Sequence, residues 1–498
     1  MQRITAFLFL CFISIHHLQA QILPKEGRAL NYRIIGFSFP PVTNNSEYIF
    51  ELAIGSHNSE ESFKKNIINT YICKASRKIV EVPFWGQEYT WRIRSANEGP
   101  GAISSFHHFS TLFKNKTDSC KVRLRIMQEA KKYKEGYVFL DANKALYNMK
   151  GEAVWFLPGK TFLHVSVRDM KATPFGTITL MLKDEEKVYE INYEGDILWQ
   201  GPNTGAVSGN ATEHYHHEFT RLANGHYMAL GNEMFWESPK HRDSSAADTN
   251  LYHSTEPMPT IIEYDENGKL VWSWLSSGYF RTSDLINFNT KFFVQKVPVD
   301  VDVHANSFYF DEKAKVIYLS FKGISRIVKV KYPEGVVLNT YGAVFHRGVP
   351  EQRNGLFCEQ HSIKHSPNGY IYMYNNNPCE TGHSAKLIEM EEPASGKTEL
   401  KKIWEYECTV EGNYSKESLA SGGGNVMELP DSSLFVSMGG AYSKVFIVSH
   451  SKDILWSAIP EKWLPAQQKW SVVPQYRASI IEDRKVLEKL IWTAEKHK

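Results

Sequence analysis

The sequence predicts an all-β protein, a six-bladed β-propeller preceded by a small N-terminal β-sandwich-like domain. Three observations lead to this fold class. A turn followed by an apolar pair and usually a tryptophan recurs six times, an apolar strand precedes most of the copies, and histidines occupy matching positions in three repeats. Strand units that repeat along a chain are typical of propellers. An open β-solenoid or a row of sandwiches is the alternative for the same pattern.

The first twenty residues predict a cleavable secretory signal peptide. Arg3 supplies a basic start, an apolar run extends from Ala6 to Ile15, and Leu18 to Ala20 resembles a cleavage site. The apolar run is shorter than a bilayer requires, which disfavours a membrane anchor. We therefore expect a secreted or periplasmic protein with no membrane span.

Residues 21–135 form the predicted N-terminal β-rich domain. Runs such as YIFELAI and YTWRIR are rich in aromatic and β-branched residues and indicate short strands. No chemical motif occurs in this region. Its polar turns and short strands fit a small β-sandwich.

Cysteine pairing is expected in an oxidising compartment. The chain has six cysteines, and one of them, Cys11, would leave with the signal peptide. The candidate disulfides are Cys73 with Cys120 and Cys358 with Cys379, which would leave Cys408 over. Sequence alone does not fix this connectivity.

Residues 136–476 carry the repeats and form the predicted propeller. The six copies of the turn motif end at Trp155, Trp199, Trp272, Leu338, Trp404 and Trp456. Each copy is expected to be a tight turn that leads into an outer strand, with its large apolar side chain packed between blades. Residues 477–498 have apolar residues at roughly helical spacing and are expected to form a C-terminal capping segment.

Three histidines occupy one equivalent place in three repeats. An Asn-Gly pair begins seven residues after both His217 and His361, and Asp311 lies seven residues after His304. Equivalent positions of a propeller converge on its axis, so the three imidazoles are expected to meet there. Lys322 ends the return strand of the hairpin that follows His304, and it is expected near the same place.

Three imidazoles and one ammonium group suggest two kinds of chemistry. Three histidine ligands with an open position suit zinc or copper, but an adjacent ammonium repels a cation. A site for a sulfate or phosphate ester fits better, because imidazole is a nucleophile and an acid near neutral pH and a cationic cage stabilises charge on the transferred group. We expect no metal and no other cofactor. The net charge of +2 gives no indication of a nucleic-acid partner.

These motifs resemble those of the arylsulfate sulfotransferase family, the secreted and sulfonucleotide-independent kind. That family has paired histidines followed by an acid, then a His-x-Asn-Ser motif with a basic residue eighteen positions after its histidine, then a Gln-His pair. The matching residues are His216, His217 and Glu218; His304, Asn306, Ser307 and Lys322; and Gln360 and His361. The resemblance covers most of residues 136–460 and implies a six-bladed propeller with an N-terminal β-domain.

The resemblance also implies an activity, the ping-pong transfer of a sulfuryl group from a phenolic sulfate to a phenol. It implies that His361 is the nucleophile that forms a sulfohistidine. His217 and His304 would bind the sulfate and protonate the leaving phenolate, and Lys322 would hold a sulfuryl oxygen. The remaining substrate-binding candidates are His216 and Asn306. An aryl-sulfate hydrolase, in which water takes the sulfuryl group, is the alternative among enzymes. The family usually has arginine where this chain has Lys322, and loss of the bidentate fork leaves a non-enzymatic binding module as a second alternative.

Overall fold

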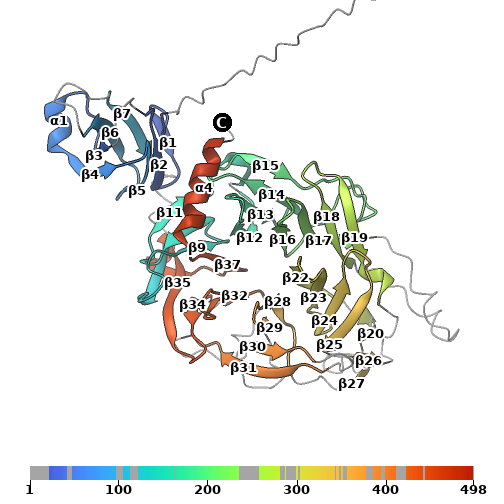
Figure 1. Ribbon diagram of the computed structural model, residues 1–498. Coiled ribbons are helices and arrows are strands. Elements are labelled where there is room, and N and C mark those ends of the chain that lie inside the picture. The colour runs from blue at the N-terminus through green and yellow to red at the C-terminus, as the bar shows by residue number, and fades with distance from the viewer. Residues whose placement is uncertain are drawn as a thin grey trace, which may run out of the picture. The chain divides into compact units, whose positions relative to one another are not determined.

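The structure is a computed structural model, and it divides into two compact units, Met1–Phe113 and Lys114–Lys498 (Figure 1). It describes residues 22–41, 47–96, 105–112, 122–162, 164–234, 257–280, 286–287, 299–300, 303–342, 344–346, 349–351, 356–376, 385–393, 399–410, 422–440 and 443–496. The predicted signal peptide lies outside these residues. No helix in the described ranges is long and apolar enough to cross a membrane.

The first unit contains two β-sheets and one short helix. The larger sheet has the strand order β1-β7-β6-β3-β4, and β2 pairs with β5. The bounds are β1 (Arg28–Leu30), β2 (Ile34–Ser38), β3 (Tyr48–Ile54), α1 (Glu60–Lys65), β4 (Ile67–Cys73), β5 (Arg77–Glu81), β6 (Glu88–Ser95) and β7 (His107–Thr111). Helix α1 begins after Ser59, whose side chain accepts a hydrogen bond from the Ser62 N–H.

Aromatic side chains fill the core of the first unit. The ring of Phe37 in β2 lies 4.8 Å from that of Phe50 in β3 and 5.2 Å from that of Trp91 in β6. All three side chains are fully buried. Edge-to-face aromatic pairs at this spacing contribute beyond their buried area. The two sheets therefore share one apolar core, which is compatible with the predicted sandwich.

The second unit consists mostly of antiparallel sheets of four strands. Written from the inner strand outward, these are β37 (Ala478–Ile481), β9 (Tyr137–Leu140), β10 (Ala145–Asn148) and β11 (Ala153–Phe156); β12 (Val167–Ala172), β13 (Ile178–Leu182), β14 (Lys187–Ile191) and β15 (Ile197–Gln200); β16 (Phe219–Arg221), β17 (Tyr227–Glu233), β18 (Met258–Tyr264) and β19 (Leu270–Leu275); β22 (Ala305–Asp311), β23 (Val316–Phe321), β24 (Arg326–Lys331) and β25 (Val337–Gly342); β28 (His361–His365), β29 (Tyr370–Asn375), β30 (Lys386–Glu391) and β31 (Lys401–Glu407). A larger sheet contains β32 (Asn425–Glu428), β33 (Leu434–Ser437), β34 (Val445–Val448), β35 (Ile454–Leu464) and β36 (Lys469–Val472), with β8 (Val122–Gln128) paired to β35.

The second unit also contains smaller elements. They are the strand pairs β20 (Ile286–Asn287) with β21 (Val299–Asp300) and β26 (Val344–His346) with β27 (Val349–Glu351), the 3-10 turns η2 (Lys160–Phe162), η3 (Ser276–Gly278) and η5 (Pro465–Gln467), and the C-terminal helix α4 (Arg484–Lys496).

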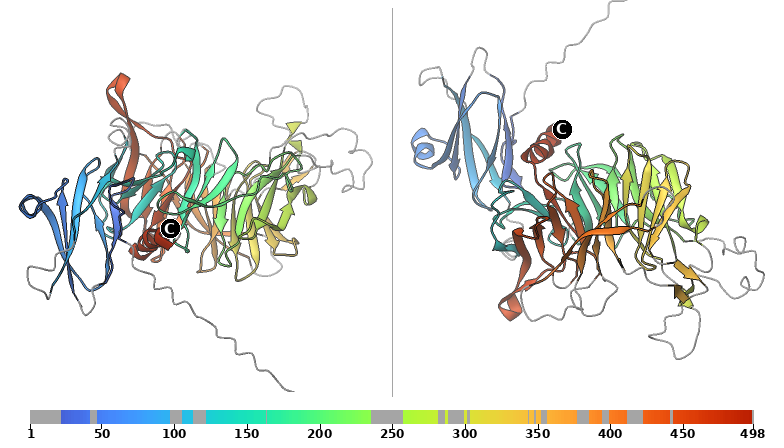
Figure 2. Two further views of the ribbon diagram at one scale, coloured as in Figure 1. Left: turned by 90° about the horizontal axis from the view of Figure 1, so that it is seen from above. Right: turned by 60° about the horizontal axis from the view of Figure 1, so that its bottom comes forward.

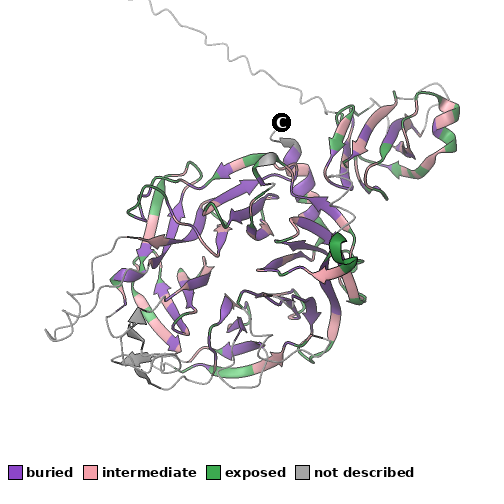
Figure 3. Ribbon diagram, turned by 180° about the vertical axis from the view of Figure 1, so that it is seen from behind, coloured by how far each residue is buried: buried purple, intermediate pink, exposed green. Residues whose placement is uncertain are grey.

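The sheets of the second unit surround a common centre. Strands β12, β16, β22, β28, β32 and β37 lie nearest to it (Figure 1), and buried residues predominate in these inner strands (Figure 3). Strand β37 pairs with β9, so the first sheet of the unit contains a strand from its C-terminal end. Side views show the sheets edge-on, with the β35–β36 hairpin extending beyond them (Figure 2). This mostly-β architecture is consistent with a propeller.

Tryptophans of the outer strands join neighbouring sheets, as the sequence predicts. The indole N–H of Trp155 in β11 donates to the carbonyl of Tyr193 at 2.7 Å. Trp456 in β35 likewise donates to the carbonyl of Met149 at 3.1 Å, which links the last sheet to the first. Leu338 is the exception, because its side chain is 48% exposed and does not fill the space between two sheets.

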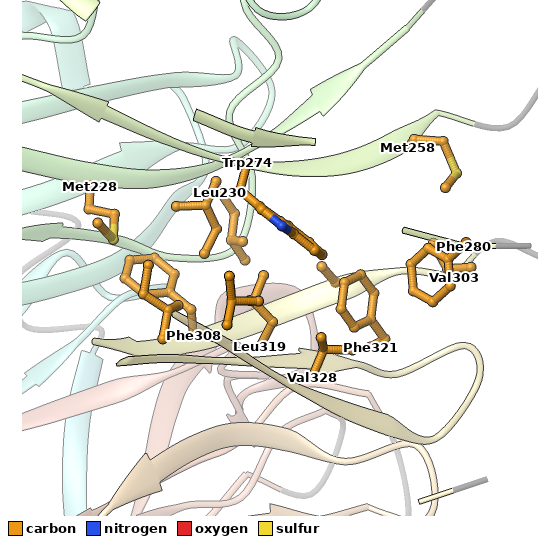
Figure 4. Close-up of a cluster of buried hydrophobic side chains, with 14 of the residues drawn as sticks. Met228, Leu230, Met258, Trp274, Phe280, Val303, Phe308, Leu319, Phe321 and Val328 are labelled. Carbon is orange, nitrogen blue, oxygen red and sulfur yellow. The ribbon is translucent and has the colours of Figure 1, made fainter. Parts of the chain in front are cut away.

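A cluster of buried apolar side chains packs β17–β19 against β22–β24 (Figure 4). Leu230 of β17, Trp274 of β19 and Leu319 of β23 contribute to it. Phe280 meets Phe321 edge-to-face, with ring centroids 4.9 Å apart. Burial of each such side chain contributes about 1.5–3 kcal/mol, so sheet-on-sheet packing of this kind stabilises the unit.

Three sequence-based expectations need correction. The unit boundary follows Phe113 rather than residue 135, because β8 pairs with β35 of the second unit. The tail does not begin as a helical cap, because residues 478–481 form β37 before α4 starts. Cys73 is a free, buried cysteine in the first unit, so the Cys73–Cys120 pairing is wrong.

The predicted partners of both cysteine pairs, Cys120 and Cys379, lie outside the described residues. The pairing of Cys358 with Cys379 therefore stays a prediction. Cys358 itself is buried, and its N–H donates to the side chain of Asn375 at 2.9 Å. Cys408 is a free cysteine, as expected for the residue that neither predicted disulfide includes.

Candidate active site

The starts of four inner strands have irregular backbones. His217 and His304 have φ angles of 61° and 49°, in the left-handed region that residues other than glycine rarely adopt. Asp169 and Ser362 have φ angles of 52° and 55°. Register shifts occur at the same places in β12, β22 and β28. Bulges of this kind redirect side chains, and they place the residues before the regular strands at the centre of the unit.

A chain of hydrogen bonds links each inner strand to the next. In five of these bonds, a side chain near the start of one inner strand accepts from a backbone N–H of the next inner strand. In the sixth, the acceptor is Asp141, which directly follows β9 of the first sheet. The pairs are Asp141 with Met170 (3.1 Å), Asp169 with Phe219 (2.9 Å), Glu218 with Phe308 (3.0 Å), Ser307 with Ile363 (3.0 Å), Ser362 with Val426 (3.2 Å) and Asn425 with Ala478 (3.0 Å). These bonds fix the spacing of the inner strands, because each buried N–H that lost its acceptor would cost about 1–3 kcal/mol.

The three predicted histidines come together at the centre of the unit. The rings of His217 and His304 lie 4.8 Å apart. Tyr476, just before β37, lies 5.7 Å from the ring of His217 and 6.4 Å from that of His361. We call Arg168, His217, His304, Lys322, His361 and Tyr476 the axial cluster.

His361 is held in one orientation by its neighbours. Its Nδ1–H donates to Asn376 Oδ1 at 2.6 Å, and the Asn376 amide is fixed because its Nδ2 donates to the Gly423 carbonyl at 2.8 Å. Nε2 is then the acceptor nitrogen, and the Gly423 N–H lies 3.2 Å from it. His361 is only 2% exposed. Burial lowers its pKa to about 3, and the charges of Arg477 and Lys322 add to the shift although the Asn376 contact opposes it.

His216 determines which nitrogen of His217 carries a proton. Its Nε2 faces the Gly231 carbonyl at 2.9 Å and Asn232 Oδ1 at 3.0 Å, both acceptors, so Nε2 carries the hydrogen. Its Nδ1 therefore accepts from His217 Nδ1–H at 2.8 Å. The Nε2 of His217 is left as a basic nitrogen. Burial holds the pKa of His217 well below its usual value, and nearby imidazoles and the Arg168 guanidinium lower it further.

Lys322 lies beside the histidines, as predicted. Its backbone N–H donates to the His304 carbonyl at 2.9 Å, and its half-buried side chain is close enough to His361 to lower that residue's pKa. Asn306 was a candidate for substrate binding, a role for which an accessible side chain is expected. It is fully buried, and its Nδ2 donates to the carbonyl of Gln360 at 2.7 Å, so it supports the backbone just before His361.

Arg477 is a buried cation close to the cluster, and no sequence motif contains it. Its guanidinium donates to Asp169 at 2.8 Å and to the Asn306 carbonyl at 2.7 Å, and lies 3.6 Å from Glu218. These carboxylates raise its already high pKa although burial opposes them. Arg477 thus neutralises two buried carboxylates and fixes the strand that follows Tyr476.

Gly423 and Gly424 occupy the corresponding place before β32. A Cβ on Gly424 would lie 2.6 Å from Cε1 of Tyr374, and both glycines have positive φ angles. This inner strand therefore contributes a backbone N–H, from Gly423, rather than a side chain. The GGG run at residues 422–424 was the signal for this close approach.

No group of three or more histidine, cysteine, aspartate or glutamate side chains within the described ranges is arranged to hold a metal ion. The axial cluster instead combines imidazoles with guanidinium, ammonium and phenol groups. This set suits an anion, because it offers positive charge and hydrogen-bond donors together.

Comparisons with known proteins agree with this chemistry at the level of the family. The Arylsulfotransferase (ASST) family matches residues 110–445, which contain the three histidines. No curated protein matches the chain.

Solved structures resemble the chain only distantly. A protein of unknown function from Bacteroides caccae is 12% identical, with a TM-score of 0.37, over 73% of this chain and 100% of that one. A catalytically inactive virginiamycin B lyase from Staphylococcus aureus, in a structure with quinupristin, is 11% identical, with a TM-score of 0.37, over 69% of this chain and 85% of that one. Likenesses this weak carry no argument about function. The family match covers most of the chain, and the chain belongs to the arylsulfotransferase (ASST) family.

Proposed function

We propose that this protein transfers a sulfuryl group from a phenolic sulfate to a phenol through a sulfohistidine at His361. The observation that carries the proposal is the state of His361. Its Nδ1–H is engaged by Asn376, and its pKa of about 3 keeps Nε2 unprotonated at neutral pH. An unprotonated, oriented imidazole beside unprotonated His217 and a lysine is what nucleophilic attack on an anionic ester needs.

In the first half-reaction, the Nε2 lone pair of His361 attacks the sulfur of the bound aryl sulfate. The new N–S bond forms as the sulfur–oxygen bond to the aryl group breaks, and the electron pair leaves on the phenolic oxygen. Charge spreads over the three sulfuryl oxygens, as in phosphoryl transfer. Lys322 and the Gly423 N–H would stabilise this charge. During the attack, the Gly423 N–H would donate its hydrogen bond to a sulfuryl oxygen instead of to His361 Nε2.

In the second half-reaction, a phenol attacks the sulfur of the sulfohistidine. Nε2 of His217 is the base that takes the phenol proton, since His216 occupies its Nδ1–H. The S–O bond forms, the N–S bond breaks, and His361 regains its lone pair. The proton held on His217 then serves the next leaving phenolate, so both half-reactions use one site.

Further features belong to the same proposal. The second unit is a six-bladed propeller closed by β37, and the first is an N-terminal β-sandwich-like domain. The predicted signal peptide directs the chain to the periplasm or outside the cell. The reaction as written uses protein side chains and requires no cofactor.

The test is turnover of 4-nitrophenyl sulfate by the full chain, with and without phenol as acceptor. We expect 4-nitrophenol release that depends on phenol, together with an equal amount of phenyl sulfate. Phenol-independent release would indicate a hydrolase, and no release would leave a binding module. His361→Ala should abolish release while the variant still unfolds in a cooperative thermal transition, which shows that it is folded.

A further inference from the structure

Arg168 is the member of the axial cluster that neither the sequence motifs nor the family resemblance assigns. It precedes the left-handed residue Asp169 in β12, as His361 precedes Ser362 in β28. Its guanidinium carbon lies 4.2 Å from the centre of the Tyr476 ring. This stacking gives the side chain a fixed position beside the histidines.

Arg168 differs from Arg477 in its partners. Arg477 has two carboxylates. Arg168 forms no ion pair or hydrogen bond with any residue that the structure describes. Burial lowers its pKa, which means that the charged side chain is incompletely solvated. A half-buried cation of this kind would be stabilised by an anion that is not part of the protein.

The position of Arg168 points to the part of the substrate that it meets. Strands β12 and β28 lie on opposite sides of the ring (Figure 1), so Arg168 and His361 start from opposite sides of the centre. In sulfuryl transfer, as in phosphoryl transfer, the attacking and leaving atoms lie roughly in line with the transferred group between them. With His361 as the attacking group, the phenolic oxygen is directed away from it, toward the side of Arg168 and His217.

Charge balance supports the same assignment. Burial and neighbouring charges, that of Arg168 among them, hold the pKa of His217 well below its usual value, so its imidazole is unprotonated at neutral pH. Lys322 lies beside His361 and is available to the sulfuryl oxygens. Of the two described arginines near His217, Arg477 is paired with Asp169 and Glu218, whereas Arg168 has no carboxylate in an ion pair. A phenolate that forms beside Arg168 meets an oriented guanidinium, and stabilisation of this type is usually a large part of catalysis.

We propose that Arg168 is a further catalytic residue, which stabilises the negative charge on the phenolic oxygen of the leaving and attacking phenols. This inference rests on the proposed function for its reaction. The sulfur–oxygen bond breaks, the electron pair moves to the phenolic oxygen, and Arg168 holds that oxygen until His217 or solvent protonates it. As a result, the site accepts phenols that are poorly acidic.

The first test compares aryl sulfates whose phenols differ in acidity, from 4-nitrophenyl sulfate to phenyl sulfate. In Arg168→Met we expect kcat/KM to fall about tenfold or less with the activated ester and about 10²–10³-fold with phenyl sulfate, the range for loss of an oxyanion donor. Arg168→Lys should recover part of the loss for phenyl sulfate. Lys322→Met, by contrast, should reduce kcat/KM by a similar factor across the series.

Two outcomes would overturn the assignment of Arg168. An equal loss for every ester would mean that Arg168 contacts the sulfuryl group, as Lys322 does. No loss with any ester would mean that the side chain only packs against Tyr476. Arg484→Met, on the exposed face of α4, is the matched control and should keep wild-type values throughout.

A second measurement separates this inference from the proposed function, because it needs no turnover. Bound 4-nitrophenol is titrated by its phenolate absorbance. The wild type should lower the pKa of the bound phenol by about one unit or more, the effect of a cation within 4–6 Å, and Arg168→Met should not. An enzyme that turns over no aryl sulfate but shows this shift would overturn the proposed reaction alone, whereas an unshifted pKa in the wild type would overturn the role of Arg168.

Discussion

Replacement of Arg477 by methionine removes a buried cation close to the axial cluster. Methionine has a similar length and no charge, so the main change is electrostatic. Asp169 and Glu218 would remain buried with one cation fewer, and removal of one partner from a buried ion pair costs about 3–5 kcal/mol. Lys171 and Lys364 still contact these carboxylates. We therefore expect a loss of about 3 kcal/mol in the free energy of unfolding.

Urea unfolding followed by tryptophan fluorescence measures this loss. The transition assigned to the second unit should move to lower urea, since that unit contains the buried Trp155 and Trp456. Arg484→Met changes an exposed arginine nearby in the chain and should leave the midpoint nearly unchanged. If Arg477→Met were as stable as the wild type, the account of a buried ionic network that fixes the inner strands would be refuted.

Three further predictions concern acid stability, close packing and proton placement. His361 has a folded pKa of about 3 against about 6.5 unfolded, so below about pH 6.5 the unfolded chain takes up a proton that the folded chain excludes. The free energy of unfolding therefore falls by about 1.4 kcal/mol per pH unit between about pH 6.5 and 3 on account of this group. In His361→Gln, the number of protons taken up on unfolding, obtained from the pH dependence of urea unfolding, should fall by up to one. Gly424→Ala should destabilise much more than Gly369→Ala in thermal unfolding, because both glycines have positive φ angles but only at Gly424 would the new Cβ collide with a ring; equal effects would contradict the packing. His216→Phe removes the acceptor of His217 Nδ1–H and should lower kcat about 10²-fold with little change in KM, as steady-state kinetics would show; an unchanged kcat would rule out the proton assignment.

Much of the site could be predicted because its residue types are chemically distinctive. Histidines at matching offsets from a turn stand out in any sequence, and convergence at the axis of a repeat fold follows from geometry. The structure brings His217, His304 and His361 together with Lys322. The outer-strand tryptophans were equally visible, because five of the six copies of the turn motif end in one.

Other features depend on contacts that no local pattern reveals. Arg168 and Tyr476 lie at equivalent places in their strands but are not histidines, and Tyr476 reaches the site only because β37 returns to the first sheet. Asn376 belongs to no recognisable motif, although its amide orients His361. The acid after His217 appeared only as a family feature, whereas Glu218 accepts the N–H of the next inner strand. Such roles are set by neighbours that are distant in sequence.

The mass of the peptide that contains His361 tests the central claim most directly. The full chain is mixed with 4-nitrophenyl sulfate in the absence of acceptor, quenched at alkaline pH, digested and analysed by mass spectrometry. The account predicts one added sulfuryl group on His361, which disappears when phenol is supplied before the quench. A sulfuryl group on another residue, or full turnover by His361→Ala, would contradict it.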